Sequence, residues 1–215
     1  KEFQWNDLQE YDRGKVLSKE DLDEIEEFGR YLDVDGDGVP YRTYPGTHPQ
    51  KGAYFTRGTS HDEYARYTED GVKNAEILSR LTKKFQTASS TVPAPIFNQE
   101  ASTSSIGVIY FGSTDCSMQE ALDSLKDEKI DVDAMRIRSF PFNLEVWEFI
   151  EEHDLLFIVE QNRDGQMRTL LMAEGGIMPD KLVSILCFDG QPITASFITN
   201  KINAHISGIP SVAAS

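Results

Sequence analysis

The sequence predicts an α/β fold in which an irregular and helical N-terminal segment precedes a doubly wound, mostly parallel domain. In the second half, apolar runs of strand length alternate with amphipathic segments of helical period. Such alternation indicates parallel strands that are buried on both faces and joined by right-handed helical crossovers. The first half instead has many Gly, Pro and Tyr residues and few aliphatic ones. With 215 residues, the chain is long enough to bury a substantial core.

The first element that we expect is a helix over residues 19–32. Ser18, followed three residues later by Asp21, is typical of a helix N-terminus. The apolar stripe of this helix would consist of Leu22, Ile25, Phe28 and Leu32. Residues 33–69 show no such period, so we expect a long irregular segment of the kind that often serves function or an interface.

A second helix is predicted over residues 70–87, because apolar side chains recur there at steps of three and four residues. We expect them to pack along one face; they are Val72, Ala75, Leu78, Leu81 and Phe85. Residues 87–105 then combine Ala, Ser, Thr and Pro with little periodicity, a composition typical of linkers. We therefore divide the chain into residues 1–90, a linker at 91–104 and a domain at 105–215.

Four strands and four helices are predicted in the C-terminal domain. The strands are 106–111, 132–137, 155–159 and 182–187, and the helices are 118–126, 144–153, 165–174 and 193–206. The strand runs are short and continuously apolar, as expected for a parallel sheet covered by helices on both faces.

Charge and composition exclude several classes of function. The formal net charge of −15 would repel phosphate backbones and anionic lipid headgroups, so we expect neither a nucleic-acid nor a membrane partner. No apolar run approaches the roughly 20 residues of a membrane helix, and we expect a cytoplasmic protein. Cys116 and Cys187 alone cannot build an iron–sulfur cluster or zinc ribbon within this chain. Because the sequence begins with Lys1 rather than Met, we expect a piece of a longer polypeptide.

Residues 33–38, here called the Asp loop, resemble the first half of a calcium-binding loop. Carboxylates at Asp33, Asp35 and Asp37 would converge on Ca²⁺ or Mg²⁺. The second half does not fit, because Tyr44 stands where a bidentate Glu belongs and Pro40 interrupts the following helix. The alternative, a turn of Asp and Gly residues that closes the preceding helix, is favoured.

Three further segments carry candidate chemistry. Arg57, His61, Asp62 and Glu63 lie within seven residues, where they could move a proton or bind an anionic substrate, although a hydrogen-bonded loop is favoured on chemistry alone. The turn at residues 112–115 could meet an anion at a helix N-terminus, but it lacks GxGxxG or P-loop spacing. The turn after the third strand, which contains Asn162, either binds a partner or caps a helix.

Blocks of residues along the whole chain occur in an order typical of one family. They are YDRGKVL at 11–17, DVDGDGVPYRT at 33–43, PGTHP at 45–49, GTSHDE at 58–63, IRSFPF at 137–142 and VEQN at 159–162. With these blocks the chain closely resembles the α subunit of 2-oxoglutarate:ferredoxin oxidoreductases, in the 2-oxoacid:ferredoxin oxidoreductase family. The second half resembles the transketolase C-terminal-like, Rossmann-like domain of that subunit. Ser60 and Ala65 stand where many relatives have glycine.

This resemblance implies oxidative decarboxylation of a 2-oxoacid, first of all 2-oxoglutarate, with coenzyme A, giving an acyl-CoA such as succinyl-CoA, CO₂ and reduced ferredoxin. The complete enzyme would use thiamine diphosphate, Mg²⁺ and an iron–sulfur cluster, none of which this chain would bind alone. Residues 1–90 would be the tail of the pyrimidine-binding domain and a connecting segment. The implied partners are the β subunit, the remaining N-terminal part of the α subunit, and ferredoxin.

The chain would then supply part of the active-site rim and of the subunit interface, and we expect it to be inactive by itself. No residue is predicted to be a catalyst. The side chains expected to line the approach of the 2-oxoacid or CoA, or to lie in an interface, are Arg42, Arg57, His61, Asp62, Glu63 and Asn162. Two other functions stay open: a calcium-binding interaction module with a flavodoxin-like domain, and a self-contained hydrolase that uses His61. The lack of a nucleophile elbow argues against the hydrolase.

Overall fold

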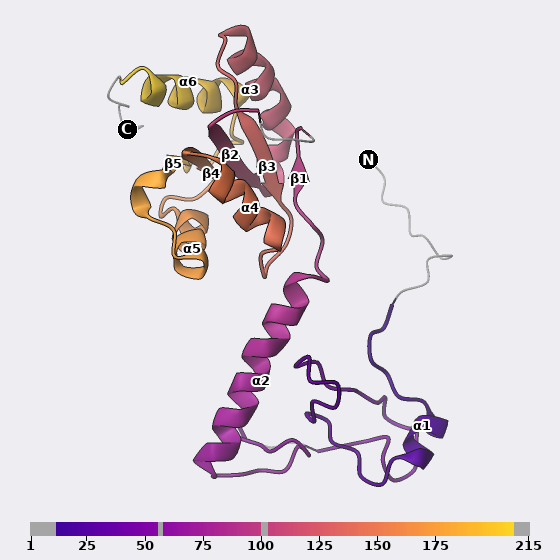
Figure 1. The fold of residues 1–215 in the computed structure, drawn as a ribbon. Coiled ribbons are helices and arrows are strands. Elements are labelled where there is room, and N and C mark those ends of the chain that lie inside the picture. Colours follow the sequence, from indigo (N-terminus) through magenta and orange to yellow (C-terminus); the bar gives the residue numbers. More distant parts are fainter. Residues whose placement is uncertain (1–11, 56–57, 100–102, 209–215) are drawn as a thin grey trace. The chain divides into compact units, whose positions relative to one another are not determined.

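The computed structural model describes residues 12–55, 58–99 and 103–208 (Figure 1). They form two compact units, an N-terminal unit that ends at Ala88 and a C-terminal unit that begins at Ser89. Among the described helices, none combines the length and the apolar character that crossing a membrane requires.

A five-stranded sheet forms the centre of the C-terminal unit, in the order β1-β3-β2-β4-β5. The strands are β1 (Ile96–Phe97), β2 (Ile106–Phe111), β3 (Asp133–Ile137), β4 (Leu155–Glu160) and β5 (Leu182–Leu186). β1 runs antiparallel to β3, and all other neighbouring pairs are parallel. β1 lies inside residues 91–104, which were predicted to be a linker. The predicted domain limits themselves stay a prediction.

Helices cover both faces of this sheet (Figure 1). They are α3 (Asp115–Asp127), α4 (Leu144–Glu152), α5 (Gln166–Gly175) and α6 (Ala195–Ile206), with short 3₁₀ turns η1 (Gly112–Thr114) and η2 (Pro179–Lys181). Side chains of α3 and α6 join one hydrophobic cluster, and side chains of α4 and α5 join a second one. The predicted doubly wound α/β fold is therefore confirmed.

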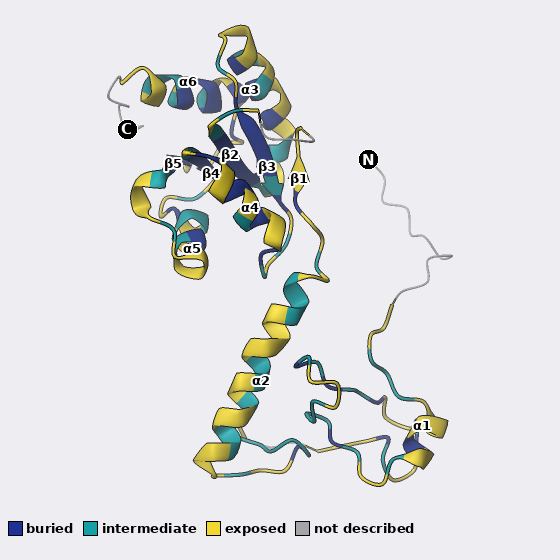
Figure 2. Ribbon diagram, viewed as in Figure 1, coloured by how far each residue is buried: buried dark blue, intermediate teal, exposed yellow. Residues whose placement is uncertain are grey.

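The two clusters follow from the alternation of side chains along buried strands. Val108 and Phe157 face the α3 and α6 cluster, whereas their neighbours Ile109 and Ile158 face the α4 and α5 cluster. All four are fully buried, and Figure 2 shows the central strands in dark blue. Burying each such side chain stabilises the fold by roughly 1.5–3 kcal/mol.

The N-terminal unit begins with α1 (Lys19–Glu24), whose predicted N-terminal cap is confirmed. Ser18 Oγ accepts a hydrogen bond from the Asp21 amide at 3.1 Å, and the Asp21 carboxylate accepts one from the Ser18 amide at 2.8 Å. The predicted extent of this helix, residues 19–32, is wrong. The helix stops after Glu24, where the Lys51 ammonium donates to the carbonyl oxygens of Leu22 and Ile25. A lysine distant in the sequence thus supplies hydrogen bonds that a further helical turn would otherwise make.

The second predicted helix is α2 (Gly71–Ser89), but its apolar stripe is not buried. Val72 is 66% exposed, and Leu78 and Phe85 are each 55% exposed. Figure 2 accordingly shows α2 in yellow and teal. The expected packing along this stripe is not found among the described residues, because α2 turns the side that carries Arg80 toward the Asp loop instead.

Polar contacts hold the irregular part of the N-terminal unit together. Buried His48 is an example: its Nδ1 accepts hydrogen bonds from the amides of Gln50 and Lys51 at 3.1 and 2.9 Å. Its Nε2 lies 3.1 Å from the Asp23 carboxylate, to which it donates. Because Nδ1 accepts and Nε2 donates, the neutral ring satisfies every partner, and His48 serves the fold.

Candidate functional site

A hollow of about 450 Å³ opens at the carboxyl ends of β2 and β4. These strands are neighbours in the sheet, yet the chain leaves β2 toward β3 on one side and reaches β4 on the other. Such a switch point is where open α/β sheets bind ligands. The hollow has an apolar lining of Phe111, Met167 and Leu170 and a polar one of Ser113, Gln161 and Asn162.

The predicted binding residue Asn162 lies at this hollow, but its hydrogen bonds serve the loop. Its amide Nδ2 donates to Glu160 at 2.8 Å, and its Oδ1 accepts from the amides of Asp164 and Gln166 at 3.1 and 3.3 Å. The structure therefore shows the helix-capping alternative for this turn, and a ligand role for Asn162 stays a prediction.

Glu160 is a residue that the sequence reasoning did not select. Its carboxylate is fully buried and accepts hydrogen bonds from the amides of Met167 and Arg168, at 2.7 and 3.1 Å, in the first turn of α5. A negative charge is favourable at this helix end. The available signal was a carboxylate at the end of an apolar strand, directly before a turn and a helix.

The two loops of the hollow are joined by Gln161. Its Nε2 donates to Ser113 Oγ at 2.9 Å and lies 3.2 Å from Thr114 Oγ1. Thr114 is buried and makes no side-chain cap for α3. Gln161 therefore fixes the loop after β4 to the loop after β2.

In the N-terminal unit, His61 is stacked on Tyr31. The ring centroids lie 4.0 Å apart with an interplanar angle of 21°. The imidazole Nδ1 lies 3.1 Å from the Asp62 carbonyl oxygen, which accepts its hydrogen. This leaves Nε2 as the nitrogen that is free to accept or exchange a proton with a ligand.

The two carboxylates next to His61 are engaged elsewhere. Asp62 Oδ1 accepts from the amides of Tyr64 and Arg66 at 2.9 and 2.8 Å, so it closes a turn. Glu63 is ion-paired with Lys73 at 3.2 Å. The structure therefore does not bring these carboxylates together with the imidazole into one constellation.

The backbone of the same turn is one that glycine adopts most easily at position 65. Ala65 adopts a φ of 67°, which favours glycine, and its side chain is buried. The alanine therefore keeps the turn at some conformational cost.

Of the two predicted arginines, Arg42 contacts a carbonyl oxygen and a tyrosine. Arg42 Nη2 donates to the Arg13 carbonyl oxygen at 2.6 Å and to Tyr44 Oη at 3.3 Å, and its guanidinium lies 5.4 Å from the Tyr44 ring centroid. Arg57 lies outside the described residues. Because these contacts of Arg42 are with Arg13 and Tyr44 rather than with His61, the structure does not group these two predicted residues.

A lysine lies between the carboxylates of the Asp loop. Lys15 Nζ is 2.6 Å from Asp35 Oδ2 and 2.7 Å from Asp37 Oδ2. The hydrogen bonds that the Lys15 ammonium donates to Asp35, and to a smaller extent to Asp37, raise the pKa of Lys15 above its ordinary value. Asp33 points to the Gly38 amide, from which it accepts at 3.0 Å. Among the described residues, no group of three or more His, Cys, Asp or Glu side chains is arranged to hold a metal ion, and cation binding at the loop stays a prediction.

Gly38 explains why the Asp loop needs its second glycine. Its φ is 81°, and a Cβ atom there would lie 2.4 Å from the Lys84 amide nitrogen and 2.9 Å from the Arg80 carbonyl oxygen. The loop backbone therefore packs directly on the backbone of α2. This close contact gives the Asp and Gly pattern a structural reason that does not involve a metal.

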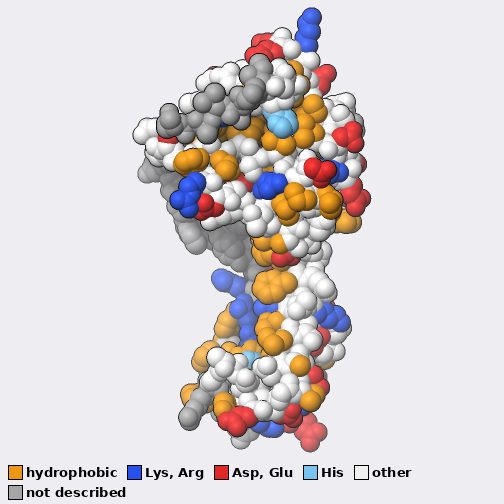
Figure 3. Space-filling view, turned by 90° about the vertical axis from the view of Figure 1, so that its left-hand side faces the viewer, with side chains coloured by type: hydrophobic (Ala, Val, Ile, Leu, Met, Phe, Trp, Pro, Cys, Tyr) orange, Lys and Arg blue, Asp and Glu red, His pale blue; other side chains and the backbone are white. Residues whose placement is uncertain are grey.

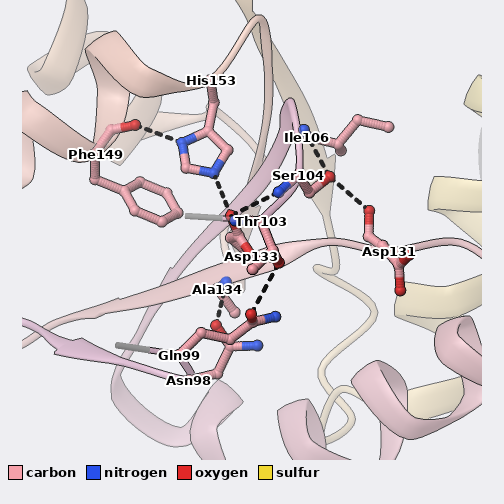
Figure 4. A network of polar contacts seen from close by, with 10 residues as sticks. All are labelled: Asn98, Gln99, Thr103, Ser104, Ile106, Asp131, Asp133, Ala134, Phe149 and His153. Atoms are coloured by element: carbon pink, nitrogen blue, oxygen red, sulfur yellow. Dashed lines mark hydrogen bonds and ion pairs between the residues drawn. The ribbon is translucent and has the colours of Figure 1, made fainter. Parts of the chain in front are cut away.

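A second polar network lies in the C-terminal unit (Figure 4). Asp133 accepts hydrogen bonds from Thr103 and Ser104 amides at 2.9 and 3.1 Å, and fully buried His153 places Nε2 3.1 Å from the same carboxylate. His153 Nδ1 lies 2.6 Å from the Phe149 carbonyl oxygen. Since both nitrogens face acceptors, the geometry is satisfied when both carry hydrogen. The network ties the segment before β2 to β3 and α4 and is shielded from ligands.

Comparison with curated proteins identifies relatives in two archaea. The chain matches no family model. It is 32% identical over 187 residues to 2-oxoacid:ferredoxin oxidoreductase 2, subunit alpha, of Aeropyrum pernix, a match that covers 84% of this chain and 27% of that protein. It is 26% identical over 200 residues to the 2-oxoacid:ferredoxin oxidoreductase subunit alpha of Saccharolobus solfataricus, covering 91% of this chain and 30% of that protein.

A solved structure shares the fold. It is the 2-oxoglutarate:ferredoxin oxidoreductase from Magnetococcus marinus with 2-oxoglutarate, coenzyme A and succinyl-CoA bound, with a TM-score of 0.73 and 21% identity. The match covers 86% of this chain and 32% of that one. The chain thus spans about a third or less of the length of these relatives. By sequence and fold together, the chain belongs to the family of 2-oxoacid:ferredoxin oxidoreductase α subunits.

Proposed function

We propose that the chain is part of the α subunit of a thiamine-dependent enzyme that converts 2-oxoglutarate and CoA into succinyl-CoA and CO₂ and reduces ferredoxin. The observation that carries this proposal is the 32% identity to an α subunit over 84% of the chain. The solved relative from Magnetococcus marinus, which has 2-oxoglutarate, CoA and succinyl-CoA bound, supports this choice of 2-oxoacid.

The cofactors would be held outside this chain. An iron–sulfur cluster is generally bound by four cysteine thiolates, whereas the chain has Cys116 and Cys187 only. Cys187 is buried, and its burial raises the pKa of its thiol, which disfavours the thiolate that a metal would need. We therefore place the cluster outside this chain. As the family resemblance implies, thiamine diphosphate and Mg²⁺ would also be bound by the β subunit and the rest of the α subunit, with ferredoxin as the electron acceptor.

The contribution of this chain would be an active-site rim and an interface with those partners. His61 offers Nε2 on a ring that Tyr31 holds in place, and Arg42 keeps further N–H groups beyond its two bonds. Cationic and imidazole groups suit the carboxylates of a 2-oxoacid and the phosphates of CoA. Arg57, Asp62, Glu63 and Asn162 complete the proposed rim and interface set.

Exposed apolar side chains support the interface role. In the N-terminal unit, Phe55 is 81% exposed, and Tyr67, Leu78 and Phe85 are each more than half exposed. Aromatic residues are enriched where proteins bind one another, and exposed large apolar side chains suit such surfaces. A partner subunit that covers these side chains would explain why α2 keeps an apolar stripe.

Reconstitution tests the proposal. The 215-residue chain is co-expressed with the remaining α segment and the β subunit, and CoA-dependent reduction of methyl viologen is followed with 2-oxoglutarate, pyruvate and branched 2-oxoacids. We expect activity with 2-oxoglutarate in the reconstituted enzyme and none from the chain alone. Turnover by the chain alone, or a reconstituted enzyme without 2-oxoacid activity, would contradict the proposal.

The rim role of His61 has a separate test in that enzyme. His61→Ala should weaken subunit association or raise the apparent KM for the 2-oxoacid or CoA, because a rim residue acts on binding. A general acid or base would instead lower kcat by about 10²–10⁴-fold with assembly intact. The control is His205→Ala, which changes an exposed histidine in the last turn of α6. Wild-type assembly, KM and kcat in His61→Ala would exclude a rim role.

A further inference from the structure

We propose that Arg30 and Arg80, gathered around the ring of Tyr31, form a binding site for a phosphoryl group. Arg30 follows α1 and Arg80 lies in the middle of α2, so the fold brings together two side chains that are far apart in the sequence. The choice of CoA as the natural source of that phosphoryl group rests on the proposed function, whereas the site itself does not.

The geometry centres on Tyr31. The guanidinium carbon of Arg30 lies 5.3 Å from its ring centroid, and that of Arg80 lies 5.8 Å from it. His61 is stacked on the same ring. Arg30 also lies 5.6 Å from the Tyr54 ring centroid and its Nε donates to Tyr54 Oη at 3.3 Å. Aromatic contacts thus hold both guanidinium groups in place while leaving most of their N–H groups for a ligand.

Neither arginine has an ion-paired carboxylate among the described residues. Arg66, Arg136 and Arg163, in contrast, pair with Glu27, Asp115 and Asp164. Two guanidinium groups beside one ring, without a described carboxylate partner, concentrate positive charge locally in a chain whose net charge is −15. On the face of the N-terminal unit drawn in Figure 3, Lys and Arg side chains gather beside hydrophobic ones.

The nearby carboxylates are occupied by other donors. Lys15 forms ion pairs with Asp35 and Asp37, and the Gly38 amide donates a hydrogen bond to one oxygen of Asp33. Asp33 still acts on Arg80 electrostatically, but no ion pair joins them. Lys15 thus offsets one of the three negative charges of the Asp loop, and none of the three carboxylates forms an ion pair with Arg30 or Arg80.

Arg80 has a nitrogen whose hydrogen-bonding capacity is not used. Its Nη1 donates to the Gly38 carbonyl oxygen at 2.9 Å, but its buried Nε has no hydrogen-bond partner in the described part of the chain. Burial lowers the pKa of Arg80; Asp33 opposes this shift, and the positive charge of Arg30 adds to it. A bound anion would offset both the burial and the repulsion between the arginines.

A phosphoryl group fits this arrangement better than a single carboxylate. Guanidinium groups form forked hydrogen bonds with phosphate oxygens, and a tetrahedral dianion can accept from two forks at once. Two fixed positive charges also match its two negative charges. The phosphate groups of CoA, or a free phosphate or pyrophosphate ion, share this chemistry.

The test uses the 215-residue chain and isothermal titration calorimetry at low ionic strength, with inorganic pyrophosphate, CoA and 2-oxoglutarate as separate probes. We expect saturable binding that weakens as salt is added. Arg30→Gln and Arg80→Gln should each lower the affinity about tenfold or more, and Arg30→Lys should lower it less. Arg66→Gln is the matched control, because Arg66 also lies over a tyrosine ring but is paired with Glu27; it should bind as the wild type does.

Each outcome decides the proposal. Tighter binding of CoA than of pyrophosphate assigns the site to CoA, and equal binding assigns it to a free phosphoryl anion; both support the site. No saturable binding, unchanged affinity in Arg30→Gln, or selective binding of 2-oxoglutarate would overturn it. Should Arg80→Gln disturb the fold, half-buried Arg30 decides the question. Binding without reconstituted activity would contradict only the proposed function, and activity without binding only the phosphoryl site.

Discussion

The two units of the molecule reach a defined structure by different means. The C-terminal unit has two hydrophobic clusters, one on each face of a buried sheet. In the described part of the N-terminal unit, Leu22 and Ala65 are the buried hydrophobic residues, and side chains such as Lys51 and Asp62 hold the backbone instead. A unit without a large core depends on each polar contact and each special backbone angle, so its candidate functional residues are also structural ones.

Two buried histidines show the same difference on a smaller scale. His48 accepts two backbone amide bonds at one nitrogen and donates at the other, so its neutral form fits. His153 instead faces two acceptors, the Asp133 carboxylate and the Phe149 carbonyl oxygen. The first organises a turn where apolar contacts are few, and the second joins β3 to the end of α4 through hydrogen bonds inside an apolar unit.

Phe157→Ala should have the largest effect on stability. Phe157 is fully buried in the cluster of α3 and α6, and the truncation should lower the free energy of unfolding of the C-terminal unit by about 3–5 kcal/mol. Phe85→Ala, at an exposed position of α2, is the control and should change it by less than about 0.5 kcal/mol. Urea unfolding measures both, and similar losses in the two variants would break the comparison between the units.

Gly38→Ala should have the next largest effect, and in the other unit. The alanine would need a positive φ and would place Cβ 2.4 Å from the α2 backbone, so we expect a loss of about 2–4 kcal/mol. Gly36→Ala is the control in the same loop, because Gly36 has a φ of 72° but only the flexible end of Lys83 near it, at 4.0 Å. It should lose about 1 kcal/mol. Equal losses by urea unfolding would show that the loop does not pack on α2.

Acid should weaken the N-terminal unit through its hydrogen-bonded carboxylates. Bonds from the Ser18 backbone and side chain lower the pKa of Asp21 from its ordinary 3.8, and the Lys15 ammonium does the same for Asp37. A lowered pKa in the folded state means that stability is complete above about pH 4 and falls as pH drops through the folded-state pKa.

NMR spectra of α1 amides between pH 6 and pH 2 measure this loss. Ser18→Ala removes the hydroxyl donor to Asp21 but keeps the backbone amide donor, so it should reduce part of the pH dependence of the helix while lowering its stability at neutral pH. An α1 that keeps its full stability at pH 2 would contradict the assigned role of these carboxylates.

Calcium should have the smallest effect of all. The Lys15 ammonium already lies between Asp35 and Asp37, so up to millimolar Ca²⁺ or Mg²⁺ should leave the melting temperature unchanged within error. A clear increase that Asp35→Ala abolishes would revive the calcium-binding module and remove the distinction between a loop held by a lysine and a metal site.

The sequence predicted the C-terminal unit well because its information is local. The run at 106–111 coincides with β2, and the run at 155–159 misses only the last residue of β4. Buried strands need continuous apolar residues, so their limits can be read without knowledge of their partners. The switch-point turn was also found from the sequence, although Asn162 proved to cap a helix and Glu160 was not selected.

The N-terminal unit was less predictable because its decisive contacts join distant residues. The end of α1 depends on Lys51, and the charge of the Asp loop depends on Lys15. The periodicity of apolar residues along the sequence does not predict such pairs. The stacking of His61 on Tyr31 and the approach of Arg30 and Arg80 likewise appear only in the folded chain. The N-terminal cap of α1, a contact over three residues, and the helical period of α2 could be read in advance, because both are local.

Hydrogen exchange on the intact 215-residue chain, followed peptide by peptide, tests most directly the claim that one unit is held by a core and the other by polar contacts. We predict that amides of β2 and β4 exchange only through unfolding of the whole C-terminal unit. Amides of α1 and of residues 58–69 should exchange orders of magnitude faster, through local opening. Equally slow exchange in both units, or faster exchange in β2 than in α1, would contradict the claim.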